Sequence, residues 1–198
     1  MTLYEFAKKM FRLQFRIMGW KVQGAENLPT HGPVILAINH VSIWDPIVAA
    51  SSVPRHVSFM AKEELFSIPV LGTIFSKLGA FPVKRGQGDM NAIRQSLAIL
   101  KQGRVLGLFP EGTRSKTGEI QKGLPGMVLL MEKSQASVVP VKVYGTTNLL
   151  TKGWGKIGIV VGKPLTAQML KAPEGVGNRR EWIADRIMQA MMELPKAE

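Results

Sequence analysis

A histidine and an aspartate five positions apart are the residues of this sequence best suited to proton transfer. His40 and Asp45 bound a polar segment that directly follows the apolar run Val34–Ile38. A carboxylate that accepts a hydrogen bond from one imidazole nitrogen fixes the tautomer and leaves the other nitrogen free to remove a proton. General-base help of this kind contributes roughly 10²- to 10⁴-fold in rate. The pair therefore predicts a base and its orienting carboxylate, although an aspartate before Pro46 is also typical of a helix N-cap.

Two further segments carry groups that suit a phosphate ester. Phe109–Ser115 follows another apolar run, and within it Gly112 would let the backbone approach a ligand. Arg114 in the same segment offers a planar guanidinium to phosphate oxygens. Lys84 and Arg85 place two cations at the end of a short apolar run. Alone, each feature is also typical of a solvated turn or a basic strand end.

Apolar runs alternating with amphipathic segments predict the framework that positions these residues. Continuous apolar runs are typical of buried parallel strands, and apolar residues three and four positions apart are typical of helices. The predicted strands are 34–38, 57–61, 81–84, 105–109, 138–143 and 157–161, and the predicted helices are 2–18, 45–53, 70–78, 90–102, 127–133 and 179–194. The alternation predicts one α/β domain over residues 1–198, a sandwich with a largely parallel sheet flanked by helices. Such sheets bind ligands beyond the carboxyl ends of their strands, where the polar segments fall.

Composition limits the chemistry and the partners. Twenty-six Lys and Arg against fourteen Asp and Glu give a net charge of +12, which favours nucleic acid, an anionic bilayer or a phosphorylated substrate. The sequence contains no cysteine, which excludes disulfides, thiol catalysis and thiolate metal sites. Three scattered histidines do not suggest a metal cluster. We therefore expect neither a metal nor a cofactor.

Residues 1–20 predict an amphipathic helix that contacts a membrane. Its apolar positions are Leu3, Phe6, Ala7, Met10, Phe11, Leu13, Phe15, Ile17 and Met18, and its basic flank is Lys8, Lys9, Arg12 and Arg16. Insertion of Leu3, Phe6 and Phe11 is expected, although packing on the body of the domain would suit the same stripe, and both could apply to different parts of it. Charges interrupt every long apolar stretch, so we expect no signal peptide and no membrane span. The helix at 70–78 is a second candidate membrane or acyl-chain contact, with core packing as the favoured interpretation.

Together the polar segments resemble the signature blocks of the glycerophospholipid acyltransferase family, most closely its bacterial 1-acyl-sn-glycerol-3-phosphate acyltransferases. The family's N-H-x4-D block matches at Asn39, His40 and Asp45, and its F-P-E-G-T-R-S block matches throughout Phe109–Ser115. A G-x-F-x-x-[KR]-R-like block and a V-P-V block match at Gly79, Phe81, Lys84, Arg85, Val139, Pro140 and Val141. Order and spacing agree over residues 24–162, which leaves the helix expected at 178–194 outside the motif core. Many relatives carry a longer hydrophobic N-terminal region, so the depth of membrane insertion stays open.

The resemblance implies the reaction and the residues that perform it. A fatty acyl group would pass from acyl-ACP or acyl-CoA to the sn-2 hydroxyl of lysophosphatidic acid and give phosphatidic acid. His40 would act as the base with Asp45 as its partner, and the acceptor would be held by Lys84, Arg85, Glu111, Gly112, Thr113 and Arg114. No acyl-enzyme is needed, which agrees with the lack of cysteine and of a G-x-S-x-G segment. The enzyme would lie at the cytoplasmic face of the cell membrane as a peripheral or monotopic protein.

Three alternatives remain open at the level of sequence. The acceptor could instead be glycerol 3-phosphate or another lysolipid. A basic nucleic-acid-binding protein is a distant alternative, because Lys and Arg are dispersed and no recognition-motif aromatics interleave with them. A phosphoesterase could gather His40, Asp45 and Glu111 around a metal ion.

Overall fold

The apolar runs pair as one sheet in the computed structural model, which describes residues 1–84, 89–147, 149 and 157–196. Its strands are β1 (Lys21–Gln23), β2 (Val34–Ile38), β3 (Val57–Lys62), β4 (Phe81–Val83), β5 (Val105–Leu108), β6 (Ser137–Tyr144) and β7 (Gly158–Val161). Among the described residues the order across the sheet is β1-β7-β6-β2-β5-β3-β4. Every neighbouring pair is parallel except β6 and β7, which run antiparallel. The predicted α/β class with a largely parallel sheet is confirmed.

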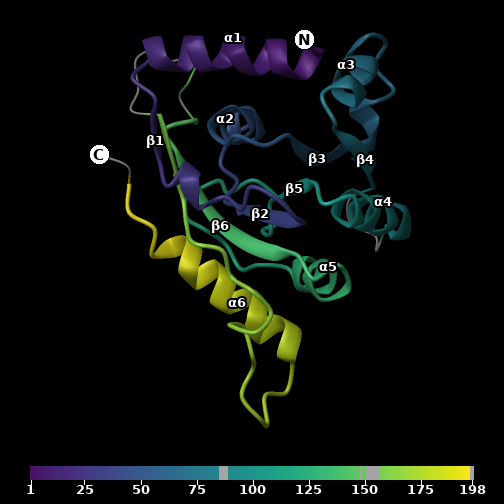
Figure 1. The fold of residues 1–198 in the computed structure, drawn as a ribbon, viewed down its shortest axis with the longest axis vertical. Helices are drawn as coiled ribbons and strands as arrows, with labels where there is room; N and C mark the ends of the chain where they lie inside the picture. Colours follow the sequence, from purple (N-terminus) through teal and green to yellow (C-terminus); the bar gives the residue numbers. More distant parts are fainter. Residues whose placement is uncertain (85–88, 148, 150–156, 197–198) are drawn as a thin grey trace.

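Helices cover both faces of this sheet (Figure 1). They are α1 (Leu3–Ile17), α2 (Asp45–Ser52), α3 (Leu71–Lys77), α4 (Met90–Lys101), α5 (Gly126–Ser134) and α6 (Arg179–Met192), with short 3-10 turns η1 (Ala25–Asn27) and η2 (Glu63–Leu65). The helices α1 and α2 pack on one face, and α4, α5 and α6 lie on the other. The helix boundaries agree with the predicted ranges to within a few residues. The strand β1 was not predicted, because three residues of mixed polarity carry no periodic signal.

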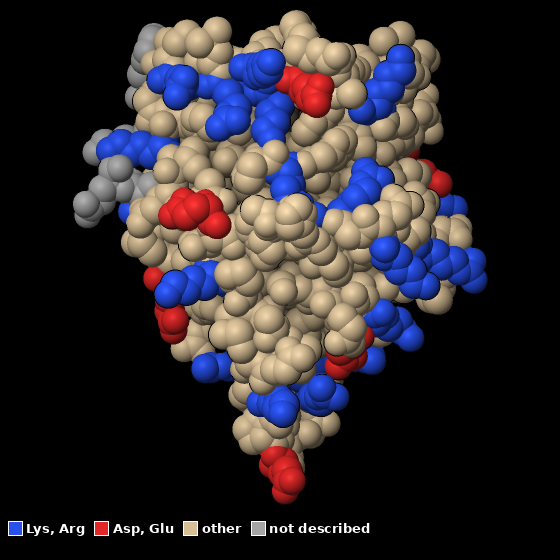
Figure 2. Space-filling view, viewed as in Figure 1, with Lys and Arg blue, Asp and Glu red and all other residues tan. Residues whose placement is uncertain are grey.

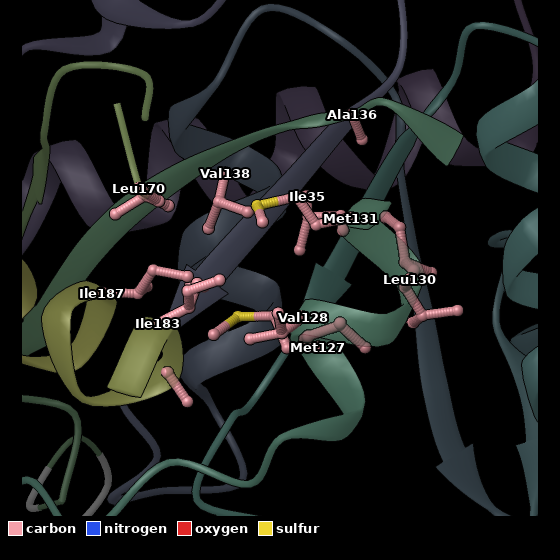
Figure 3. Packing of buried hydrophobic residues seen from close by; sticks show 14 of the residues in the cluster. Ile35, Met127, Val128, Leu130, Met131, Ala136, Val138, Leu170, Ile183 and Ile187 are labelled. Atoms are coloured by element: carbon pink, nitrogen blue, oxygen red, sulfur yellow. The ribbon is translucent and has the colours of Figure 1, made fainter. Parts of the chain in front are cut away.

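The central strand β2 shows how one short run serves two cores. Successive side chains of a strand point to opposite faces. Ile35 therefore joins the cluster beneath α5 and α6, whereas Leu36 joins the cluster beneath α1 and α2. Figure 3 shows the first cluster, to which α5 contributes Met131 beside Ile35 and α6 contributes Ile183 and Ile187. This double burial explains why the strand reads as a continuous apolar run, and it fixes the strand rigidly beneath the polar segment that follows.

Helix α1 presents two different apolar faces. The inner face packs on the domain through Tyr4, Phe11 and Phe15, and Phe11 meets the ring of Trp44 edge-on at 6.5 Å. The outer face remains exposed and consists of Leu3, Phe6, Met10, Leu13 and Ile17. Packing on the domain is therefore shown for the inner residues, whereas membrane contact by the outer residues stays a prediction. The expected insertion of Phe11 is wrong, because this ring packs on Trp44, between His40 and Asp45, and on the core cluster beneath α1.

Lys8 differs from the other cations of α1. Its Nζ donates hydrogen bonds to the carbonyl oxygens of Val53 at 2.6 Å and Pro54 at 3.1 Å, so it ties α1 to the end of α2. Lys9, Arg12 and Arg16 stay exposed. Figure 2 shows Lys and Arg gathered beneath an uncharged rim at the α1 end of the molecule. None of the helices in the described part of the chain combines the length and hydropathy that a bilayer crossing requires.

The segment from η2 to α3 departs from the expected core packing. Within α3 only Gly72 is buried, and no described residue between 63 and 79 belongs to either hydrophobic cluster. Core packing was therefore the wrong interpretation for this helix. Its apolar residues pack on each other instead, since the rings of Phe66 and Phe75 lie 6.1 Å apart.

Candidate active site

Three parallel strands end side by side at the edge of the sheet that carries the polar segments. β2 lies between β5 and β6, and the chain continues from these strands into His40, Glu111 and Thr146 respectively. From β2 the chain crosses through α2 to β3 on one side of the sheet, whereas from the neighbouring strand β6 it continues to β7 on the other side. A change of direction of this kind opens a crevice at the carboxyl ends of the strands. The fold therefore gathers these residues where α/β proteins place their ligands.

His40 and Asp45 form a buried pair. The distance from His40 Nδ1 to Asp45 Oδ2 is 2.9 Å, and the imidazole is 9% exposed. A carboxylate at Nδ1 stabilises the tautomer with its proton on that nitrogen, which leaves Nε2 as the acceptor. Within the described residues no hydrogen-bond partner occupies Nε2. The pair thus has the geometry of a base held by its carboxylate.

Asp45 does not cap helix α2, so this alternative for its carboxylate is wrong. The N-cap position belongs to Trp44, and Asp45 is the first residue of the helix. Its Oδ2 instead turns back and accepts the backbone N–H groups of Val41 and Ser42, each at 2.7 Å. These contacts close the loop between β2 and α2 around a fully buried carboxylate. The short spacing from His40 to Asp45 therefore builds a rigid loop rather than a helix start.

Glu111 holds the backbone of His40. Its Oε1 accepts the His40 N–H at 2.7 Å, and its Oε2 accepts the Gln121 N–H at 3.0 Å. The Ser115 N–H donates to the His40 carbonyl oxygen at 2.8 Å. Burial raises the pKa of Glu111, and the two N–H donors oppose that rise by favouring the charged form. The loop after β5 thus clamps both polar backbone groups of His40.

An aromatic stack fixes the plane of the imidazole. The ring of Phe109 lies on His40 with centroids 4.0 Å apart, and Phe59 lies 6.0 Å behind Phe109. Gly107 leaves the space for this stack, because a Cβ there would lie 2.2 Å from the Phe59 ring. Gly112 follows with a left-handed φ of 72°, which glycine adopts without strain, and lets the loop turn back toward β2.

The expected acceptor-binding residues fall into two groups. Thr113 and Arg114 are exposed on the loop after β5, beside the His40 loop, and Arg114 has no hydrogen bond or ion pair with any described residue. Lys84 follows β4, three strands from β2, which is about 14 Å at roughly 4.8 Å per strand. Its Nζ lies 3.8 Å from a carboxylate oxygen of Glu63. Arg85 lies outside the described residues.

Two polar residues of the site were missed in the sequence. Thr146 follows β6, is fully buried, and donates its hydroxyl to Asp45 Oδ1 at 2.5 Å. Asn39 was noted only as part of a motif, yet its side chain exchanges two hydrogen bonds with the backbone of Val143, at 2.9 and 2.6 Å. It thereby fastens the end of β2 to β6. A polar residue directly after a third buried strand was the available signal for Thr146.

This arrangement suits proton removal from a hydroxyl by His40, with the resulting imidazolium stabilised by Asp45. The metal-dependent alternative finds less support, since both Glu111 oxygens already accept backbone N–H groups. In the described ranges, no three His, Asp or Glu side chains gather closely enough to hold a metal ion.

Comparison with known proteins identifies the family of this chain. The family described as Acyltransferase matches residues 19–144, a range that includes His40, Asp45 and the loop after β5. The 1-acyl-sn-glycerol-3-phosphate acyltransferase of Bacillus subtilis is 31% identical over 168 residues, which cover 82% of each chain. A chloroplastic enzyme of the same name from Arabidopsis thaliana is 30% identical over 153 residues, but the chain spans only 43% of its length.

A solved structure supports the same relationship. The crystal structure of the 1-acyl-sn-glycerophosphate (LPA) acyltransferase PlsC from Thermotoga maritima superimposes with a TM-score of 0.73 and 25% sequence identity. The superposition covers 96% of this chain and 79% of the other. The predicted resemblance is therefore confirmed, and the chain belongs to the acyltransferase family.

Proposed function

We propose that this protein transfers a fatty acyl group from an acyl thioester to the sn-2 hydroxyl of 1-acyl-sn-glycerol 3-phosphate and so makes phosphatidic acid. The observation that carries the proposal is the buried His40–Asp45 pair at the switch point of the sheet. The names of the relatives supply the substrate class, since both bacterial and plant members are called 1-acyl-sn-glycerol-3-phosphate acyltransferases. The proposed transfer needs no covalent acyl-enzyme, which agrees with the lack of cysteine and of a G-x-S-x-G segment in the chain.

The proposed reaction is one direct acyl transfer. His40 Nε2 removes the proton of the acceptor hydroxyl while the hydroxyl oxygen attacks the thioester carbonyl carbon. The carbon–sulfur bond then breaks, and the leaving thiolate takes the proton back from the imidazolium. Asp45 stabilises the imidazolium through its hydrogen bond to Nδ1. Glu111 supports the reaction indirectly, because its carboxylate holds the backbone of His40 in place.

The acceptor phosphate would be held on the loop after β5. Arg114 offers a free guanidinium next to the His40 loop, and guanidinium groups bind phosphate oxygens in pairs. Thr113 and Gly112 shape the same loop. Lys84 at the end of β4, with Arg85 after it, would contribute positive charge at longer range. The net charge of +12 favours binding of either anionic donor, acyl-ACP or acyl-CoA. The assay described below therefore compares the two donors.

The outer face of α1 would bring the enzyme to its lipid substrate. Lys9, Arg12 and Arg16 line one flank of the exposed apolar stripe. Each basic residue near an anionic surface contributes about 1 kcal/mol to binding, so the three together would contribute about 3 kcal/mol. Insertion of the apolar stripe into the bilayer would add binding free energy that salt does not weaken. The protein would thus act as a peripheral or monotopic enzyme at the cytoplasmic face of the cell membrane.

An acyl-transfer assay with a panel of acceptors tests this proposal. Isotope-labelled acyl-ACP and acyl-CoA of one chain length are each offered with 1-acyl-sn-glycerol 3-phosphate, glycerol 3-phosphate, a lysophosphatidylcholine and a monoacylglycerol. The expected product is labelled phosphatidic acid, and the ratio of the two donor rates identifies the carrier. Preferred acylation of glycerol 3-phosphate or of a phosphate-free acceptor would overturn the assignment.

A further inference from the structure

The segment Glu63–Lys77 projects an apolar tip away from the body of the protein. After β3 the chain forms η2 and α3, which lie at the same end of the molecule as α1 (Figure 1). The side chains of Ile68, Val70 and Ile74 are exposed there. Gly72 lets the segment close on itself, because a Cβ at this position would lie 2.2 Å from the Phe66 carbonyl oxygen. The segment is therefore a self-packed unit whose outer surface has no partner within the described chain.

The tip itself is a strained turn. Val70 has φ 67° and ψ −49°, and the Leu71 N–H donates to the Pro69 carbonyl oxygen at 2.7 Å, which defines a γ-turn of the rare positive-φ kind. A β-branched residue in this region is an outlier. The Val70 side chain is 73% exposed, so packing within the domain does not compensate the strain. Strained positions of this type concentrate where a protein contacts a ligand or a partner.

The charge distribution favours a bilayer as that partner. Leu65–Ser76 contains no charged residue, although charged residues make up 20% of the sequence. The acids at the base of the segment are paired, Glu64 with Lys62 at 2.8 Å and Glu63 with Lys84 at 3.8 Å. The tip is apolar and uncharged, the acids at its base are paired, and the cationic flank of α1 lies at the same end of the molecule. This arrangement suits a bilayer, in which the tip would meet the hydrocarbon and the cations would meet the anionic headgroups.

His56 connects this segment to α1. The imidazole stacks on the ring of Tyr4 with centroids 3.7 Å apart. The Nε2 edge of the ring meets the turn that follows α3, where a Cβ at Gly79 would lie 2.4 Å from His56 Nε2. The exposed face of α1 and the tip are thus held in one rigid unit by a ring between them.

We propose that the tip Ile68–Leu71 is a second bilayer contact, which inserts among anionic phospholipids beside the outer face of α1. The inference rests on the proposed function only in so far as the acceptor is a membrane lipid. A single helix lying on a bilayer can turn about its own axis, whereas two linked contacts fix the orientation of the domain. The catalytic loop benefits directly, because Trp44 of this loop packs on Phe11 of α1 and so keeps His40 at a constant depth.

Single-cysteine labelling tests the contact without reference to activity. Because the chain has no cysteine, Val70→Cys, Leu13→Cys and Met169→Cys each give one site for a polarity-sensitive fluorophore. Met169 is 64% exposed and precedes α6, so it serves as an apolar control remote from the tip. With vesicles of phosphatidylglycerol and phosphatidylethanolamine, we expect blue-shifted emission and quenching by brominated lipid tails at positions 70 and 13, but not at 169.

The outcomes separate the possible occupants of the tip. A shift at position 13 without one at 70 would overturn the second contact and leave the α1 contact intact. A shift at position 70 that grows with protein concentration in the absence of vesicles would mean that a second copy covers the tip, which would also overturn the proposal. Acyl transfer to lysophosphatidic acid in detergent micelles is measured separately, so failure of the proposed function cannot be confused with either result.

A substitution that relaxes the turn supplies the complementary test. Val70→Gly removes the exposed side chain and also the strain at positive φ, so the melting temperature should stay equal or rise. Vesicle binding should nevertheless weaken about tenfold, the fold-change that burying one valine-sized side chain corresponds to. Met169→Ser should leave binding unchanged. Unaltered vesicle binding by Val70→Gly would overturn the proposal.

Discussion

The hydroxyl of Thr146 donates a hydrogen bond to Asp45 Oδ1 over 2.5 Å, at a position where neither residue is accessible to solvent. The other oxygen of the carboxylate already receives His40 Nδ1 and two backbone N–H groups. Thr146 therefore completes the hydrogen bonding of the buried charge and fixes the plane in which Asp45 meets the imidazole. Because its buried hydroxyl is bonded to Asp45, we expect Thr146 to act as a positioning residue.

We expect Thr146→Val to lower kcat by about tenfold or more, because a hydrogen bond to a charged group contributes roughly 1.5–3 kcal/mol. The KM values should change little. Thr146→Ser retains the hydroxyl and should restore most of kcat, whereas a purely structural role would be rescued no better by Ser than by Val. Steady-state kinetics on the three proteins decides the question, and an unchanged kcat in Thr146→Val would contradict the assignment.

His40→Ala should reduce turnover by at least about 10²-fold, the lower bound for loss of a general base. Acceptor affinity should change little, since the lost interaction belongs to the transition state. His31 is exposed and remote from the site, so His31→Ala is the matched control and should retain full turnover. Near-normal turnover in His40→Ala would rule out the proposed mechanism.

Arg114→Ala should mainly raise the KM for the phosphate-bearing acceptor, by about tenfold or more, and leave the KM for the donor nearly unchanged. Arg114→Lys should be intermediate, because an ammonium binds phosphate as a point charge without the paired geometry. Lys116→Ala, an exposed cation two positions along, controls for general loss of charge. A rise in the donor KM instead would place the arginine at the other substrate.

The two faces of α1 should respond differently to the same substitution. Phe6→Ser with Leu13→Ser alters only exposed side chains, so vesicle sedimentation in high salt should weaken while the melting temperature stays constant. Phe11→Ser removes a ring that packs on Phe15 and Trp44, so it should lower the melting temperature by several degrees. A large fall in melting temperature for the first variant, with vesicle binding intact, would show that the outer face is not the membrane contact.

His56 should make folding stability sensitive to acid. Burial, with the charges of Arg104 and Lys8, lowers the pKa of His56, and its hydrogen bond to Leu78 only partly offsets this. The unfolded chain takes up the proton first as pH falls below about 6.5, so stability is lost from there down through the folded-state pKa. His56→Phe keeps a ring on Tyr4 but cannot be protonated. The advantage of the wild type in melting temperature over this variant should therefore shrink between pH 8 and pH 5, and a constant difference would refute the linkage.

The pairing of His40 with Asp45 is a local feature and could be predicted from the sequence. His40 and Asp45 are close enough along the chain that any tight loop after β2 brings them together. The buried strands can be recognised in the sequence because both of their faces are apolar. The loop Phe109–Ser115 likewise follows its strand at once. Residue type and spacing therefore predicted the buried His40–Asp45 pair and the sheet edge on which it lies.

Only the tertiary structure decided which distant residues support that pair. Thr146 is 101 positions from Asp45, and Glu111 is 71 positions from His40, and no local pattern encodes such contacts. Local sequence patterns also do not decide which side of a helix is buried. A stripe as wide as that of α1 does not reveal which half faces the domain, and the composition of α3 does not reveal that no core lies beneath it. Those outcomes depend on what the rest of the chain packs against each surface, which is a property of the folded molecule and not of the segment.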